Sequence, residues 1–181
     1  MSDIERSVRQ FEAMLRDGGE RVDRCVAAFV GERDEDVRFL MAERLPVLGS
    51  AVGPALQAVI RQHVHDPSLQ YLAACVAVVV GERGDAVAIL CREVEERTVW
   101  ALPAANAMAR WGIREGLGPI TRALEATSAT DVQAMSDLVT ALRDLGGELP
   151  SSVRDRLLRD APGWLAQPLV RDFPDSGDAE E

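Results

Sequence analysis

The chain has 181 residues, of which 47% are hydrophobic and 4% aromatic, and its formal net charge is −10. This length suffices for one domain with a sizeable core, and the negative charge argues against nucleic acid as a partner because a phosphate backbone would be repelled. All 20 basic residues are arginines, so chemistry that depends on lysine, such as a Schiff base or a Walker-type phosphate site, is excluded.

Helical spacing of apolar residues begins near the N-terminus and continues to about residue 170. A first helix is expected to end at Gly18-Gly19. Four helix-turn-helix repeats are predicted to follow, over 20–49, 50–81, 82–112 and 113–146, and then a C-terminal helical pair at about 150–160 and 162–170. No segment alternates with the period of a strand, so we predict an all-α fold. The acidic tail 171–181 is predicted to be disordered.

The four repeats are recognised by ungapped blocks that each end in glycine. The blocks cover 34–49, 66–81, 97–112 and 131–146. They begin with a polar or turn residue, in order Asp34, Asp66, Arg97 and Asp131. Aspartate there can accept hydrogen bonds from the first N–H groups of a helix, and the final glycine can take the left-handed conformation that closes one. Each block is therefore expected to form the second helix of its repeat.

The tetrapeptide Val-Gly-Glu-Arg occurs twice, at 30–33 and at 80–83. The two copies are separated by about one and a half repeats, so the first lies inside a repeat and the second between two repeats. We interpret both as turn chemistry, in which glycine stops a helix and charged residues solvate the corner. A duplicated active-site loop is not indicated.

The block 34–49 resembles the second helix of a HEAT repeat, in particular the short HEAT-like type also found in phycobilin lyases. The matching residues are Asp34, Asp36-Val37-Arg38, Ala42, Leu45 and Gly49. The block 66–81 matches through Asp66-Pro67, Ala73-Ala74 and Gly81, but it carries Leu69-Gln70 in place of Val-Arg. The later blocks have Trp100-Ala101 and Ala134-Met135 there. The resemblance covers about 20–160 and implies a single HEAT-like α-solenoid domain over 1–170, with capping helices. It implies no particular function, because such repeats serve many roles.

In HEAT-like solenoids the second helix of each repeat lines the concave face, and the resemblance therefore implies two rows of partner-binding residues. The first row is Phe39, Tyr71, Leu102 and Ser136, and the second is Glu43, Cys75, Asn106 and Thr140. Neither row contains arginine, so phosphate recognition is poorly served, whereas the first row suits a peptide or helix of another protein. The alternative is that Phe39, Tyr71 and Leu102 only fill gaps between helices.

The sequence offers little for catalysis or metal binding. The only histidines, His63 and His65, would point to different faces of a helix, and no metal site or cofactor is expected. Cys25, Cys75 and Cys91 form no CxxC motif and are predicted to be buried, reduced thiols, which favours a cytoplasmic location. No apolar run is long enough for a membrane span, so no membrane partner is expected.

The leading hypothesis is a non-enzymatic interaction module or adaptor that binds a protein partner on its concave face, and the negative net charge suits a basic partner. A complex subunit and an immunity or inhibitor protein are both compatible with it. The alternative is a HEAT-like enzyme or ligand handler of the phycobilin-lyase or DNA-glycosylase type. A glycosylase needs a basic groove with stacking aromatic residues, and a lyase needs a tetrapyrrole pocket, for which no set of residues stands out.

Overall fold

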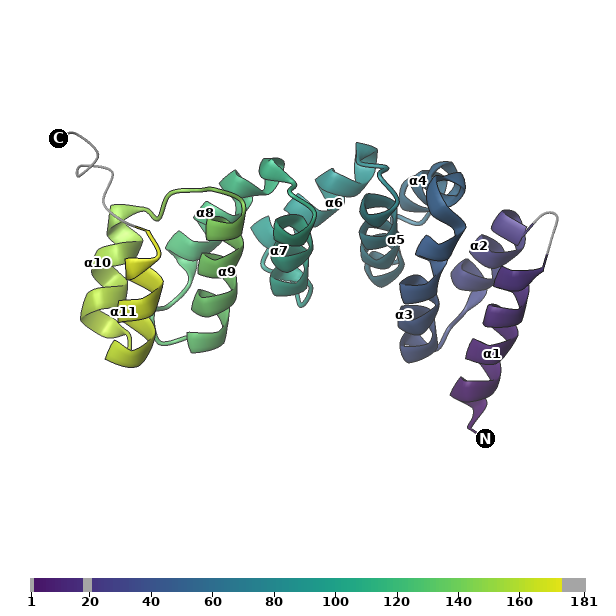
Figure 1. The fold of residues 1–181 in the computed structure, drawn as a ribbon, viewed down its shortest axis with the longest axis horizontal. Coiled ribbons are helices and arrows are strands. Elements are labelled where there is room, and N and C mark those ends of the chain that lie inside the picture. Colours follow the sequence, from purple (N-terminus) through teal and green to yellow (C-terminus); the bar gives the residue numbers. More distant parts are fainter. Residues whose placement is uncertain (1, 18–20, 174–181) are drawn as a thin grey trace. The chain divides into compact units, whose positions relative to one another are not determined.

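The computed structural model describes residues 2–17 and 21–173, and within these ranges every regular element is a helix (Figure 1). The predicted all-α class is therefore confirmed. The chain divides into two compact parts, which we call the N-terminal unit (Met1–Ile89) and the C-terminal unit (Leu90–Glu181). The division falls inside one helix, α6 (Gly84–Glu95). A single domain over 1–170 stays a prediction.

The N-terminal unit contains five helices and the first part of α6. The helices are α1 (Asp3–Arg16), α2 (Arg21–Gly31), α3 (Glu35–Arg44), α4 (Gly53–Gln62) and α5 (Pro67–Val79), and the 3-10 segment Leu45–Val52 joins α3 to α4. Helix α3 contacts α1 on one side and α5 on the other, while α2 contacts α4 (Figure 1). The largest fully buried side chains of the N-terminal unit are Phe11, Phe29, Leu45, Leu56 and Leu69.

The C-terminal unit contains the rest of α6 and five further α-helices. They are α7 (Ala101–Arg110), α8 (Leu117–Ala126), α9 (Val132–Asp144), α10 (Ser151–Asp160) and α11 (Gly163–Arg171), with a short 3-10 turn at Arg114–Gly116. Helix α9 contacts both α7 and α11, and α8 contacts α9 and α10. Every helical segment predicted within the described residues is present, with ends that differ from the prediction by a few residues.

The predicted helix starts are confirmed where aspartate begins a block. The side chains of Asp34, Asp66 and Asp131 accept hydrogen bonds from first-turn N–H groups of α3, α5 and α9. Arg97 has no such acceptor, and it lies in the turn after α6 with φ 52°. Helix α7 begins four residues later, at Ala101, without a side-chain cap.

The predicted helix ends are confirmed at Gly81, Gly112 and Gly146, whereas α3 ends at Arg44 and Gly49 lies inside the 3-10 segment that follows it. Gly49, Gly81, Gly112 and Gly146 have φ of 65°, 91°, 60° and 71° and are the glycines with positive φ among the described residues. After the last three, the next N–H donates to the carbonyl five residues earlier, as in Glu82 N–H to Ala77 O at 2.8 Å, which is the Schellman closure of a helix. Gly31 instead is the last residue of α2 and lacks this conformation. The two Val-Gly-Glu-Arg copies are therefore different structures.

The predicted start of the disordered tail at residue 171 is too early. Arg171 is the last residue of α11, and Phe173 is 7% exposed. Arg154 donates to the carbonyl of Phe173 at 2.7 Å, and Arg143 pairs with Asp172 at 2.7 Å. A buried aromatic ring and two arginine contacts therefore hold residues 171–173 against the C-terminal unit. The rest of the predicted tail, 174–181, lies outside the described residues, as does the predicted stop at Gly18-Gly19.

Candidate interaction surface

Helix α3 has one face in the core and one face in solvent. The buried side carries Val37, Met41 and Leu45. The opposite side carries exposed residues at spacings of three or four, which places them within one arc of the helix. We call this surface the α3 face, and it consists of Glu35, Asp36, Phe39, Glu43 and, just beyond the helix end, Val47.

The α3 face combines exposed apolar groups with free carboxylates. Phe39 is 47% exposed and Val47 is 70% exposed. Their neighbours on this face are Glu35, Asp36 and Glu43, all exposed, and none of the three forms an ion pair with another described residue. Transfer of a large aromatic side chain out of water is favourable, so a partner that covered Phe39 would gain binding free energy from this contact.

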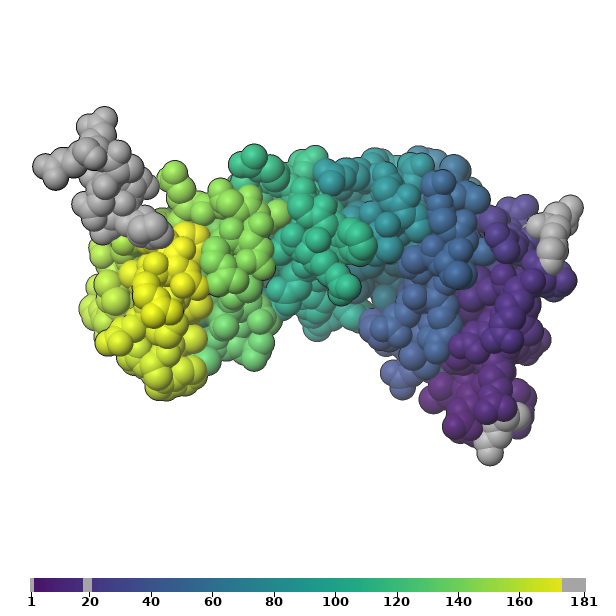
Figure 2. Space-filling model, in the orientation of Figure 1, coloured from purple at the N-terminus to yellow at the C-terminus, as the bar shows by residue number. Residues whose placement is uncertain are grey.

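A groove between α1 and α3 adjoins this face. It encloses a cavity of about 310 Å³ lined by Glu12, Leu15, Arg16, Glu43, Arg44 and Val47. Leu15 is 9% exposed and forms an apolar floor. Arg44 Nε donates to Glu12 Oε1 at 2.8 Å, and this hydrogen bond is the main reason why the pKa of Glu12 is lowered. In Figure 2 the purple surface of α1 and the dark blue surface of α3 lie against each other.

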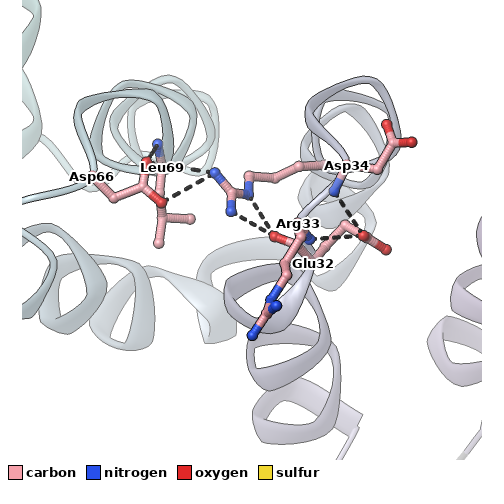
Figure 3. A network of polar contacts seen from close by, with 6 residues as sticks. Glu32, Arg33, Asp34, Asp66 and Leu69 are labelled. Carbon is pink, nitrogen blue, oxygen red and sulfur yellow. Dashed lines mark hydrogen bonds and ion pairs between the residues drawn. The ribbon is translucent and has the colours of Figure 1, made fainter.

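The guanidinium of Arg38 on α3 contacts residues at the ends of two neighbouring helices, and Figure 3 labels its partners Glu32 and Asp66. Arg38 is 8% exposed; its Nε and Nη2 donate to the carbonyl of Glu32 at 3.1 and 2.5 Å. Its Nη1 lies 3.2 Å from Asp66 Oδ2, and Asp66 Oδ1 in turn accepts from Leu69 N–H at 2.9 Å. One cation therefore ties the end of α2 to the start of α5. Arg38 is fully engaged and offers nothing to a ligand.

The other predicted binding residues of the N-terminal unit, Tyr71 and Cys75, lie on α5 in different surroundings. Tyr71 is 5% exposed, and its side chain is hydrogen-bonded to that of Cys75. Burial raises the pKa of the Cys75 thiol to about 11. Tyr71 is core, as the gap-filling alternative holds, and its assignment as an exposed partner-binding residue is corrected.

The four predicted binding residues of the C-terminal unit carry no charge. Asn106 on α7 is exposed, whereas Leu102 on α7 and Ser136 and Thr140 on α9 are partly buried. Leu102 lines a cavity of about 310 Å³ whose walls include Ala101, Ala123, Ala126, Ala134 and Leu138. Polar groups at this cavity bond within the protein, as Thr98 Oγ1 does to Glu93 at 2.6 Å. The structure thus brings together Phe39 and Glu43 in one unit, and Leu102 lies at a separate cavity in the other.

A larger cavity of about 620 Å³ lies in the C-terminal unit between the end of α9 and the start of α10. Its lining includes Arg143, Arg154, Asp155, Asp172 and Phe173. Arg143 pairs with Asp172 and with the neighbouring Asp144, and hydrogen bonds to these carboxylates raise its pKa. The arginines at this cavity are therefore engaged within the unit and do not mark an anion site.

Sequence reasoning missed Glu35, Asp36 and Val47. The signal for them was present, because they lie four, three and eight residues from Phe39, in that order, and so share its side of the chain. These three positions lie outside the two predicted rows of partner-binding residues.

No family model, curated protein or solved structure matches this chain. Over residues 2–17 and 21–173, no group of three or more His, Cys, Asp or Glu side chains is placed to hold a metal ion. Within the same ranges no helix has the length and apolar character to cross a membrane.

Proposed function

We propose that this protein is a non-enzymatic interaction module, built as a HEAT-like α-solenoid, that binds a protein partner through the α3 face. The observation that carries the proposal is the exposure of Phe39 and Val47 beside the groove floored by Leu15. Aromatic side chains next to an apolar pocket, ringed by polar groups, are typical of the anchor residues of protein interfaces. An adaptor, a subunit of a complex and an inhibitor of another protein would all use such a surface.

Three features support the solenoid part of the proposal. The glycine-ended blocks recur four times, three of their helices begin at an aspartate cap, and in each unit the second helices of successive repeats contact one another. Stacked helical repeats bury their apolar faces only against their neighbours and leave one side of each second helix available for binding.

The proposal is tested by capture of the partner from the native host. The purified protein is immobilised, exposed to host lysate at low ionic strength, and compared with Phe39→Ala and with the control Leu158→Ala. Leu158 is 55% exposed on α10 and lies outside the α3 face. We expect a stoichiometric partner on the wild type and the control, and an affinity loss of about 30-fold or more for Phe39→Ala, the usual effect of truncating an interface anchor.

Circular dichroism of each variant confirms that the fold is retained. Equal retention of the partner by Phe39→Ala and wild type would contradict the proposal, as would the absence of any stoichiometric partner.

A further inference from the structure

We propose that the segment bound at the α3 face is a basic amphipathic helix. Its apolar side chains pack on Phe39 and Val47 and into the groove above Leu15, and its cationic side chains pair with Glu35, Asp36 and Glu43. This inference rests on the proposed function and adds the chemistry of the partner.

The first argument is the separation of charge around α3. The helix contains three carboxylates and two arginines. Both arginines are engaged within the protein, because Arg38 is bound to Glu32 and Asp66, and Arg44, which lines the adjoining groove, donates to Glu12 and to the carbonyl of Leu40 at 2.8 Å. The three carboxylates of α3 form no ion pair with another described residue. The unpaired charged groups that α3 offers to a partner are thus negative.

The second argument is the order of groups along the helix. Glu35, Phe39, Glu43 and Val47 follow one another at intervals of four, so acidic and apolar side chains alternate. Within α3, which carries the first three of these residues, this interval corresponds to about 6 Å along the axis, and Val47 follows in the 3-10 segment. A partner helix that carries basic and apolar residues at the same interval of four presents the complementary order at the same spacing.

The third argument is that the carboxylates and the apolar side chains contribute differently to binding. Exposed charge pairs contribute little affinity each, but they accelerate association and reject partners of the wrong sign. The apolar contact at Phe39 supplies the anchor. We therefore expect affinity to depend on Phe39, and its dependence on salt to come from the three carboxylates.

The test uses two fluorescein-labelled synthetic amphipathic helices with leucines at identical positions, one with lysine and the other with glutamate at the polar positions. Binding is measured by fluorescence anisotropy at low and at physiological salt. The test variant is Glu35→Gln/Asp36→Asn/Glu43→Gln. The control variant is Glu96→Gln/Glu115→Gln/Glu125→Gln, which removes three exposed carboxylates of the C-terminal unit and so has the same net charge.

We expect saturable binding of the lysine peptide and none of the glutamate peptide. The test variant should bind about 10-fold more weakly at low salt, and the control should change by less than about 2-fold. Glu43→Gln alone, which lies away from the helix start, should show part of the effect and guards against misfolding of the triple variant. Absence of saturable binding by the lysine peptide, or equal weakening in test and control variants, would overturn the inference.

The two proposals can fail separately. If the native partner is lost on Phe39→Ala but kept at equal affinity by the triple charge variant, the α3 face is an interface and its occupant is not basic. If the partner is unaffected by Phe39→Ala, the proposed function itself falls.

Discussion

The two Val-Gly-Glu-Arg copies offer a stability test in which one tetrapeptide serves as the control for the other. Gly81 closes α5 with φ 91°, whereas Gly31 is the last residue of α2. An added Cβ would meet no atom within 4 Å at either position, so substitution by alanine changes only the backbone preference. Both glycines belong to the N-terminal unit. Gly81→Ala should therefore destabilise this unit, whereas Gly31→Ala should not.

The magnitudes follow from the two conformations. An L-residue in the left-handed conformation costs about 1–2 kcal/mol, and the stiffer unfolded chain offsets about 0.4–1 kcal/mol of this, so Gly81→Ala should lose about 1 kcal/mol. Alanine in a helix is favoured over glycine by up to about 1 kcal/mol, so Gly31→Ala should be neutral or stabilised. The free energies of unfolding of the two variants should differ by about 1–2 kcal/mol.

Urea unfolding followed by two probes measures this difference. Circular dichroism at 222 nm reports both units, whereas tryptophan fluorescence reports the C-terminal unit, because Trp100, Trp111 and Trp164 all lie there. If the units unfold separately, Gly81→Ala should shift the urea midpoint measured by circular dichroism and leave the midpoint measured by tryptophan fluorescence unchanged. A Gly81→Ala variant as stable as wild type, or equal shifts for both variants, would refute the reasoning.

Three further predictions concern buried groups of the N-terminal unit. Tyr71→Glu places an unpaired charge in the core and should lower the melting temperature by many degrees, whereas Tyr71→Phe loses one hydrogen bond, about 1 kcal/mol; a wild-type melt for the glutamate variant would show that the ring is not core. A double-mutant cycle of Arg38→Met and Asp66→Asn, in which asparagine keeps the helix cap, should give a coupling of about 1–2 kcal/mol in urea unfolding, and a value near zero would contradict the clamp. Because the folded pKa of Cys75 is raised to about 11 from 9.0, its thiol favours folding fully below pH 9 and progressively less as pH rises toward 11; Cys75→Ala should remove this part of the alkaline loss of stability, and an unchanged pH profile would count against it.

The helices could be predicted because their limits are set by nearby residues. An aspartate before a helix and a glycine after it act on the backbone within one turn. Three aspartates and three of the block-ending glycines therefore gave the limits without knowledge of the tertiary structure. One exception was Arg97, where the block has no cap and the helix begins later than its repeat predicts. The other was Gly49, because α3 already ends at Arg44 and continues as a 3-10 segment.

The exposure of the candidate residues could not be predicted in the same way. Phe39 and Tyr71 occupy the same position of successive blocks, yet one is 47% and the other 5% exposed. The identity of the neighbour that covers a side chain depends on tertiary packing, which the spacing of apolar residues does not contain. The error at residue 171 has the same origin, because Asp172 is held by Arg143 of α9 and Phe173 by Arg154 of α10, and both arginines are distant in sequence.

The carboxylates on the exposed side of α3 are specific to the first block. At the positions that match Glu35, Asp36 and Glu43, the other three blocks have no charged residue; the matching residues are Pro67, Ser68 and Cys75, then Thr98, Val99 and Asn106, then Val132, Gln133 and Thr140. Helices α5, α7 and α9 form without carboxylates at these positions, so this helical architecture does not require them. The three carboxylates form no ion pair with another described residue, and three like charges beside an exposed aromatic ring repel one another, which packing alone does not explain. A cationic partner would remove that repulsion, and the same contact would cover Phe39.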